Sequence, residues 1–179
     1  MEKSSMAQLG RLTPEDFRAM EKFPLVLVLD QIRSALNVGS IFRTADAFGL
    51  EGLVLCGITA QPPHREILKT ALGSTETVNW TYVPDTLDAI LDLKAKGYRI
   101  FAAEQTTDKI WLQDFDAPAF LPCALVLGNE VEGVSDQVLA QCDGAIEIPQ
   151  FGSKHSLNVA VAAGIVVWEL VRKARMMQL

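Results

Sequence analysis

The sequence predicts an α/β fold, namely a mainly parallel sheet with helices on both faces. Its candidate strands are short, continuous apolar runs, such as residues 25–30 and 124–127, without the alternation of a strand that has one wet face. Segments with helical spacing separate most of these runs, which is the order of βαβ units. No linker, repeat or low-complexity stretch divides the 179 residues. We therefore expect one domain over 25–179, preceded by a short helical extension over 1–24.

Each element has a local signal of its own. Thr13 can cap the first helix, with Pro14 at the first helical position and acids in the first turn. The second helix has apolar residues at helical spacing and ends at Gly49, and the longest one carries basic residues near its C-terminus. In chain order, helices are expected at 14–22, 37–48, 65–71, 86–96, 135–142 and 156–176. Strands are expected at 25–30, 52–56, 79–83, 99–103, 124–127 and 145–148.

The composition is that of an ordinary globular protein, with 49% hydrophobic and 21% charged residues. The longest apolar run, 159–168, is shorter than the roughly 18 residues that a membrane span needs. The N-terminus has no apolar signal core, so nothing directs export. The three cysteines form no CxxC pair, which favours free thiols in a reducing compartment. We expect a cytoplasmic protein with no membrane partner.

The charge is unevenly distributed along the chain. The net charge of −6 argues mildly against a nucleic-acid partner, but residues 76–147 hold thirteen acids and four bases, a balance of −9. The rest of the chain has a balance of +3. It contains the basic residues nearest to the polar segments described next, which are Arg33, Arg43, Arg65, Lys69 and Lys154. A locally basic face on an acidic body is therefore compatible with the sequence.

Three polar, glycine-bearing segments lie beside apolar stretches, at 37–43, 127–133 and 148–158. Buried surfaces do not carry Asn, Arg, Glu and Ser without partners, because each unpaired polar group costs a few kcal/mol. Ligands of parallel sheets bind beyond the carboxyl ends of the strands, where these segments fall. The three segments, called motifs one, two and three below, therefore predict one shared site.

Several familiar signatures are absent. Motif two has the two glycines of a phosphate-binding loop but no Lys after Gly133, and its acids would repel a triphosphate. No GxGxxG follows a strand, and no GxSxG elbow indicates a hydrolase. His64 and His155 lack the further ligands of a metal site, so no metal is expected.

Taken together, the three motifs closely resemble those of the SpoU/TrmH family of RNA ribose methyltransferases, within the SPOUT superfamily. The pattern N-x-G-x-x-x-R of motif one is matched by Asn37, Gly39 and Arg43. The apolar strand and G-x-E-x-x-G of motif two are matched by 125–127, Gly128, Glu130 and Gly133. The pattern I-P-x-x-G-x-x-x-S-L-N of motif three is matched by Ile148, Pro149, Gly152, Ser156, Leu157 and Asn158. The resemblance runs from about residue 25 to the C-terminus.

The resemblance implies transfer of a methyl group from S-adenosylmethionine to a ribose 2′-hydroxyl of RNA, by a homodimer whose C-terminal part forms a deep trefoil knot. The residues that it implies for the cofactor are Leu127, Gly128, Asn129, Ile148, Ser156 and Leu157. Those that it implies for catalysis are Arg43, Asn37, Glu130, Ser156 and Asn158. Transfer RNA is modestly favoured over ribosomal RNA, because the long extra domain of many rRNA-modifying members is missing.

In this hypothesis Arg43 holds the phosphate beside the acceptor ribose, because a guanidinium is a poor general base. Asn37 and Asn158 orient Arg43 and the ribose, Glu130 fixes Arg43 or a backbone turn, and Ser156 contacts substrate phosphate. Simpler roles stay open at this point: Asn37, Ser156 or Asn158 as helix caps, the glycines as turn residues, and Arg43 or Glu130 as surface charges. Two other functions also stay open: a non-catalytic RNA- or nucleotide-binding protein on the same fold, and an unrelated dinucleotide enzyme.

The last expected helix is apolar on nearly every face between residues 157 and 168. Such a helix must be buried on each side. Burial within one chain is possible, but burial in a two-fold interface fits the resemblance better, with Ile165 or Val166 as interface positions.

Overall fold

The computed structural model describes residues 10, 12–154 and 156–175, and it has one seven-stranded sheet in which all paired strands are parallel. The strand order is β3-β2-β1-β6-β4-β7-β5. The strands are β1 (Phe23–Asp30), β2 (Leu50–Cys56), β3 (Trp80–Val83), β4 (Arg99–Ala103), β5 (Lys109–Trp111), β6 (Cys123–Leu127) and β7 (Gly144–Glu147). The predicted α/β class is therefore confirmed.

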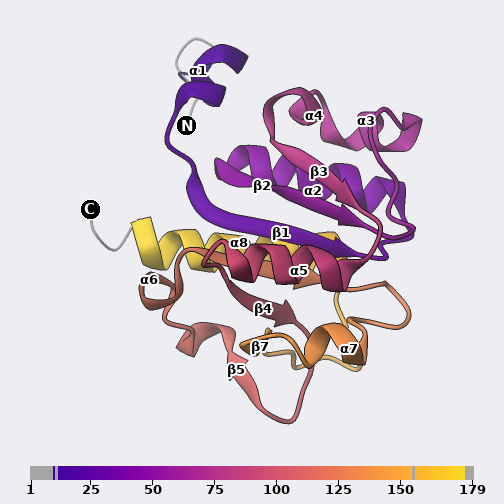
Figure 1. Cartoon of the computed structure of the whole chain (residues 1–179), viewed down its shortest axis with the longest axis vertical. Coiled ribbons are helices and arrows are strands. Elements are labelled where there is room, and N and C mark those ends of the chain that lie inside the picture. Colours follow the sequence, from indigo (N-terminus) through magenta and orange to yellow (C-terminus); the bar gives the residue numbers. More distant parts are fainter. Residues whose placement is uncertain (1–9, 11, 155, 176–179) are drawn as a thin grey trace.

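Helices cover both faces of this sheet (Figure 1). They are α1 (Pro14–Ala19), α2 (Ala35–Ala47), α3 (Arg65–Ala71), α4 (Ser74–Thr77), α5 (Thr86–Ala95), α6 (Ala117–Phe120), α7 (Asp136–Leu139) and α8 (Val159–Arg175), with a 3₁₀ turn at Leu112–Asp114. The strands send alternate side chains to two cores. Leu27 and Leu125 face the core covered by α2 and α8, whereas Val28 and Val126 face the core covered by α5 and α7.

Six of the seven strands were predicted, with ends that differ by at most two residues. The seventh, β5, is a three-residue edge strand and was missed. α1 is shorter than predicted, because it ends at Ala19 rather than at residue 22. The predicted Thr13 cap is confirmed, since its hydroxyl accepts a hydrogen bond from the Asp16 N–H at 3.1 Å. The predicted end of the last helix, Met176, lies outside the described residues.

The apolar helix α8 is buried on one face only. Its buried residues are Ala163, Val166, Val167, Leu170 and Val171. Val161, Ile165 and Trp168 lie on the other face with exposed fractions of 52%, 38% and 44%. Val166 is therefore a core residue of the single chain, and the expectation that it lies at an interface was wrong. An interface position stays a prediction for Ile165, because this residue belongs to the exposed apolar stripe of Val161, Ile165 and Trp168.

The cysteines are free, as predicted, and Cys56 and Cys123 are buried in the sheet. Burial raises the pKa of each of these two thiols to about 12, so they are unreactive near neutral pH. No helix in the described part of the chain is long and apolar enough to cross a bilayer. The trefoil knot and the division into 1–24 and 25–179 stay predictions.

Candidate functional site

The loops of motifs two and three meet at the carboxyl ends of β4, β6 and β7, where they line a cleft of about 630 Å³. Five of the six residues predicted for the cofactor line this cleft: Leu127, Gly128, Asn129, Ser156 and Leu157. The sixth, Ile148, lines an adjoining smaller cavity that shares Ser156 and Leu157 with the cleft. The structure therefore brings all six together, at the edge of the sheet that the sequence indicated.

Motif two is a tight loop that folds back on itself. The backbone groups of Asn129 and Gly133 exchange two hydrogen bonds, of 3.0 and 2.9 Å. Gly128 lies so close to the other end of this loop that a Cβ at this position would overlap the backbone of Gly133 and Val134. The Asn129 side chain braces the loop, because its amide nitrogen donates to the Gln31 carbonyl at 2.8 Å. Gly128 is thus required by a close backbone approach, which is more than an ordinary turn role.

Glu130 connects motif two to the start of α2. Its carboxylate accepts hydrogen bonds from the Arg33 N–H at 2.8 Å, the Ser34 N–H at 3.0 Å and the Asn37 side-chain amide at 2.8 Å. Partial burial alone would raise the pKa of Glu130, but these hydrogen bonds outweigh it and hold the pKa below its ordinary value. Glu130 therefore fixes a backbone turn, which is one of the two roles expected for it. Arg43 is not among its partners.

The same chain of hydrogen bonds continues to motif three. The Asn158 side-chain amide donates to the Asn37 side-chain oxygen at 3.1 Å. The Asn158 oxygen caps α8, because it accepts from the Ala160 and Val161 N–H groups at 2.9 and 3.3 Å. Asn37 is not the cap of α2, since Ser34 takes that position. Glu130, Asn37 and Asn158 thus join the three motifs, and Asn158 both caps a helix and belongs to the site.

Arg43 lies apart from this chain. It is exposed on α2 and lines a different cavity, of about 520 Å³, together with Lys69 and Thr70 of α3. Six residues separate Arg43 from Asn37, which places them roughly 9 Å apart along the helix and on different faces. Of the five residues predicted for catalysis, Glu130, Ser156 and Asn158 line the cleft, Asn37 is hydrogen-bonded to two of these, and Arg43 does neither.

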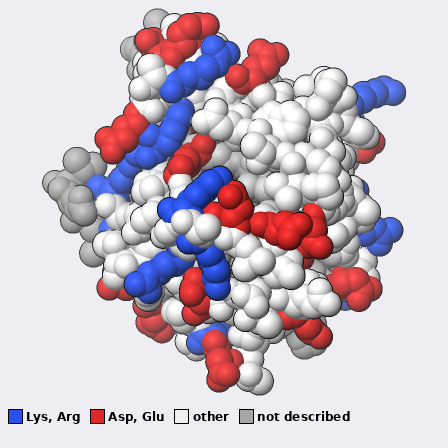
Figure 2. Space-filling view, viewed as in Figure 1, with Lys and Arg blue, Asp and Glu red and all other residues white. Residues whose placement is uncertain are grey.

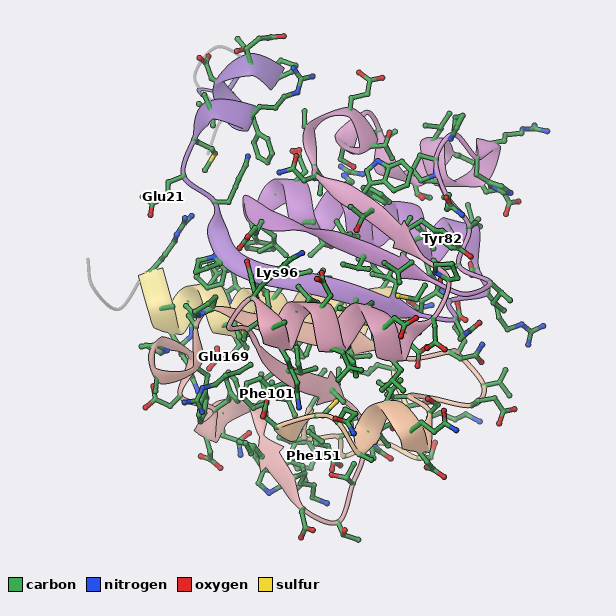
Figure 3. All side chains as sticks on the ribbon, in the orientation of Figure 1. Glu21, Tyr82, Lys96, Phe101, Phe151 and Glu169 are labelled. Carbon is green, nitrogen blue, oxygen red and sulfur yellow. The ribbon has the colours of Figure 1, made fainter. Side chains whose placement is uncertain are left out.

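Two features of the motif-three side were not anticipated. Glu104, the first residue after β4, lines both cavities. Its carboxylate holds motif two in place by accepting from the Val134 N–H at 3.0 Å. The sequence could have indicated Glu104, because a polar residue directly after an apolar strand lies at the edge of the sheet where ligands bind. Phe151, on the loop beside β7, is 98% exposed (Figure 3), which is unusual for an aromatic side chain.

The two cavities of the cleft are acidic. Their lining includes the carboxylates of Glu104, Glu130, Glu132 and Asp136, and that of Glu147, which is paired with Lys109 at 3.2 Å. Among the described residues that line them, none is Lys, Arg or His. Outside the uncertain positions, no group of three or more His, Cys, Asp or Glu side chains could hold a metal ion. The cleft therefore suits a ligand with positive charge and apolar surface.

The fold and the site define an α/β protein whose ligand cleft is built from two loops of a parallel sheet. The sequence model of the SpoU rRNA Methylase family matches residues 24–168, and the chain belongs to this family. A Staphylococcus saprophyticus protein named as a TrmH family tRNA/rRNA methyltransferase is 34% identical over 158 residues, or 87% of this chain and 61% of that protein. The 23S rRNA (guanosine-2′-O-)-methyltransferase RlmB of Vibrio parahaemolyticus is 32% identical over 93% of this chain and 66% of its own length.

Solved structures share the fold. The A. aeolicus TrmH/SpoU tRNA modifying enzyme superposes with a TM-score of 0.80 at 28% identity, covering 92% of this chain and 82% of that one. An AdoMet-bound rRNA methyltransferase from Sinorhizobium meliloti gives a TM-score of 0.78 at 30% identity, covering 90% of this chain and 61% of that one. The chain spans about three fifths of the length of the first curated relatives it matches. The family that the three motifs resemble is confirmed.

Proposed function

We propose that this chain transfers a methyl group from S-adenosylmethionine to a ribose 2′-hydroxyl of RNA. The observation that carries the proposal is the hydrogen-bonded chain from Glu130 through Asn37 to Asn158, which joins the three motifs at one cleft. Two comparisons support it: the Vibrio relative is named for 2′-O-methyl transfer to guanosine, and the Sinorhizobium structure contains AdoMet.

The residues of the cleft fit S-adenosylmethionine. Ile148 and Leu157 offer apolar surface to an adenine ring, and the backbone groups of Leu127 and Gly128 can pair with the ring edge. The carboxylates of the cleft favour a ligand that carries a sulfonium. When bound, S-adenosylmethionine would supply a methyl group activated by a positively charged sulfur: the ribose oxygen would bond to the methyl carbon, the carbon–sulfur bond would break, and the hydroxyl proton would pass to water.

The acceptor ribose must be placed in line with that methyl group. Arg43 holds the neighbouring phosphate through its planar fork, and Ser156 contacts phosphate at the mouth of the cleft. Asn37 and Asn158 are already held by each other and by Glu130, so they meet the ribose without a reorganisation cost. Positioning of this kind supplies several kcal/mol of barrier reduction.

A second copy of the chain brings Arg43 to the cleft. Within one chain Arg43 does not line the cleft, so a complete site needs another source for this group. The exposed apolar stripe of Val161, Ile165 and Trp168 on α8 gives the surface for a two-fold dimer. The stripe adjoins α2, because Trp168 contacts Phe48 at the end of α2 with ring centroids 6.1 Å apart.

Transfer RNA in the cytoplasm is the favoured substrate. The following assay distinguishes methylation of tRNA from methylation of ribosomal RNA. Purified protein is incubated with methyl-labelled S-adenosylmethionine and with total tRNA or protein-free rRNA in separate reactions. The RNA is then hydrolysed with alkali, which needs a free 2′-hydroxyl to cleave the next phosphodiester. A ribose 2′-O-methyl group therefore leaves the label in an alkali-resistant dinucleotide, whereas base methylation leaves it in mononucleotides.

We expect labelled dinucleotides from tRNA. Label in rRNA alone would overturn the preference for tRNA and leave the reaction intact. Label in mononucleotides would overturn the ribose assignment. If neither RNA is labelled while S-adenosylmethionine still binds, the chain is a non-catalytic member of its family.

A further inference from the structure

The groove between α2 and α3 has the opposite charge to the cleft. It is lined by Ser40, Arg43, Thr44, Ala47, Phe48, Lys69 and Thr70, with no acid among these residues. The hydroxyls of Ser40, Thr44 and Thr70 already donate to backbone carbonyls, at 2.9 to 3.2 Å. Arg43 and Lys69 are therefore the groups that can donate to a ligand in this groove.

Neither of these two cations has a carboxylate partner among the residues that the structure describes. In the described part of the chain, no carboxylate lies within 4.0 Å of Arg43 or Lys69, and the same is true of Arg65 one turn before Lys69. Asp46, three residues after Arg43, instead accepts a hydrogen bond from Thr77 and interacts with the charge of Lys22.

Of the eleven other Lys and Arg side chains that the structure describes, five form ion pairs. Lys96 bonds Asp92, Lys109 bonds Glu147, and Arg172 bonds Glu169. On the face that carries α5, acids and bases are accordingly interspersed (Figure 2). Arg43 and Lys69 differ from the other unpaired cations because they line one cavity that contains no acid, and such a cavity suits an anionic ligand.

The geometry of the groove is fixed by Gly39 of motif one. A Cβ at Gly39 would overlap the Thr70 hydroxyl and the Ile67 carbonyl, so the absence of a side chain lets α3 lie directly against α2. This contact brings Lys69 to the same cavity as Arg43. Arg65 and Lys69 are four residues apart and share one face of α3. The three cations therefore form a row that begins at α2 and continues along α3.

We infer that Arg43, Lys69 and Arg65 hold successive phosphates of the substrate RNA along this groove, so that α3 is an RNA-docking element. The inference rests on the proposed function, because it needs an RNA that reaches the acceptor site. Arg43 holds the phosphate beside the acceptor ribose, and Lys69 and Arg65 guide the backbone away from it. These contacts are to phosphates alone, so they set orientation and affinity and are indifferent to base sequence.

The test uses charge reversals with a matched control. Lys69→Glu and Arg65→Glu are compared with Lys94→Glu, because Lys94 also lacks an acid partner but lies on α5, at the opposite face of the sheet. Binding of labelled total tRNA is measured over a range of salt, with single-turnover methyl transfer, calorimetry of S-adenosylmethionine binding and sedimentation alongside. Lys69→Arg is included as the conservative variant.

We expect Lys69→Glu to weaken RNA binding about tenfold, and to reduce the salt slope by about one, as for a lost phosphate contact. Lys69→Arg should restore both, and S-adenosylmethionine binding should not change. The inference is overturned if Lys69→Glu and Lys94→Glu bind RNA equally well while the wild-type protein still methylates RNA, an outcome that leaves the proposed function intact. A Lys69→Glu protein that loses its dimer mass would also overturn it, because a second copy would then occupy the groove.

Discussion

The cleft beyond the sheet and the groove between α2 and α3 are built from neighbouring segments but have opposite chemistry. The cleft is lined by loops, backbone groups and five carboxylates, and Glu104, Glu130 and Asn158 fix its shape by hydrogen bonds. The groove is lined by two helices, and its charged groups are cations with no carboxylate partner among the described residues. A cationic methyl donor and an anionic RNA are attracted to different surfaces, so charge favours the donor in the cleft and the RNA backbone along the groove.

The two regions share α2, whose first turn carries Asn37 at the cleft while Arg43 faces the groove. In a single chain the donor and acceptor surfaces are therefore adjacent but separate. A dimer would bring the groove of one copy to the cleft of the other. The predictions below test this relation, beginning with the largest expected effect.

The first prediction concerns the dimer itself. Ile165→Asp places a carboxylate on the apolar stripe of α8 in both copies. Burial of each carboxylate in the interface should cost about 2 kcal/mol, so dimerisation should weaken about a thousandfold. Sedimentation should change from twice the chain mass to the chain mass at micromolar concentration. Leu91→Asp is the control, because Leu91 is a similarly exposed apolar residue on α5, at 45%. A wild-type protein that is itself monomeric would contradict the dimer.

The second prediction separates the two regions by function. Arg43→Ala should lower single-turnover methyl transfer at saturating RNA by a factor of about 100 or more, or about 2.7 kcal/mol of transition-state stabilisation. S-adenosylmethionine should bind as before, because the proposed contact of Arg43 is to the RNA phosphate and not to the cofactor. Arg43→Lys should recover little, since an ammonium lacks the planar fork. A near-normal rate in Arg43→Ala would leave Arg43 as a surface charge.

The third prediction concerns the shape of the cleft. Any Cβ at position 128 overlaps the backbone of Gly133 and Val134, and relief of the overlap should cost about 2 kcal/mol, or about 30-fold in S-adenosylmethionine affinity. Because the overlap begins at the Cβ, Gly128→Ala should already show most of the loss seen in Gly128→Val. Calorimetry measures both affinities, and RNA binding through the groove serves as the internal control. Unchanged affinity in Gly128→Val would place the cofactor elsewhere.

The sequence predicted most of the fold, because buried parallel strands are continuous apolar runs and helices carry their caps locally. It missed β5, since three residues that include Lys109 and Trp111 at a sheet edge have no apolar run to detect. It also predicted that the three motifs share a site, from the rule that parallel strands end at one edge. It did not predict which groups meet, because Asn37 and Asn158 are 121 residues apart and only the folded sheet brings them together.

Two residues lie where the motifs and the apolar pattern did not place them. The catalytic role of Arg43 stays a prediction, but within one chain Arg43 lies away from Asn37, because six residues on a helix turn the side chain by roughly 240° and move it to another face. Val166 was offered as an interface position because α8 looks apolar on every side. The alternation of buried and exposed positions along α8 depends on what the helix packs against, which one sequence does not contain.

The last prediction is the smallest, and it tests the bond that joins motif two to α2. The pKa of Glu130 is lowered in the folded chain by hydrogen bonds to its charged form, against the opposing effect of burial. Its contribution to stability is therefore fully present above the unfolded value near 4.5 and is lost as the pH falls through the lower folded value. Glu130→Gln removes this titration, so the difference in unfolding free energy between wild type and variant should shrink as the pH falls below about 4.5. Urea unfolding from pH 6 to pH 3 measures this difference.

Glu132→Gln is the matched control, because no described residue donates a hydrogen bond to the Glu132 carboxylate. The stability of this variant should depend on pH as that of the wild type does. If Glu130→Gln and Glu132→Gln behave alike, the contacts of Glu130 do not hold the cleft to the helix that carries the groove.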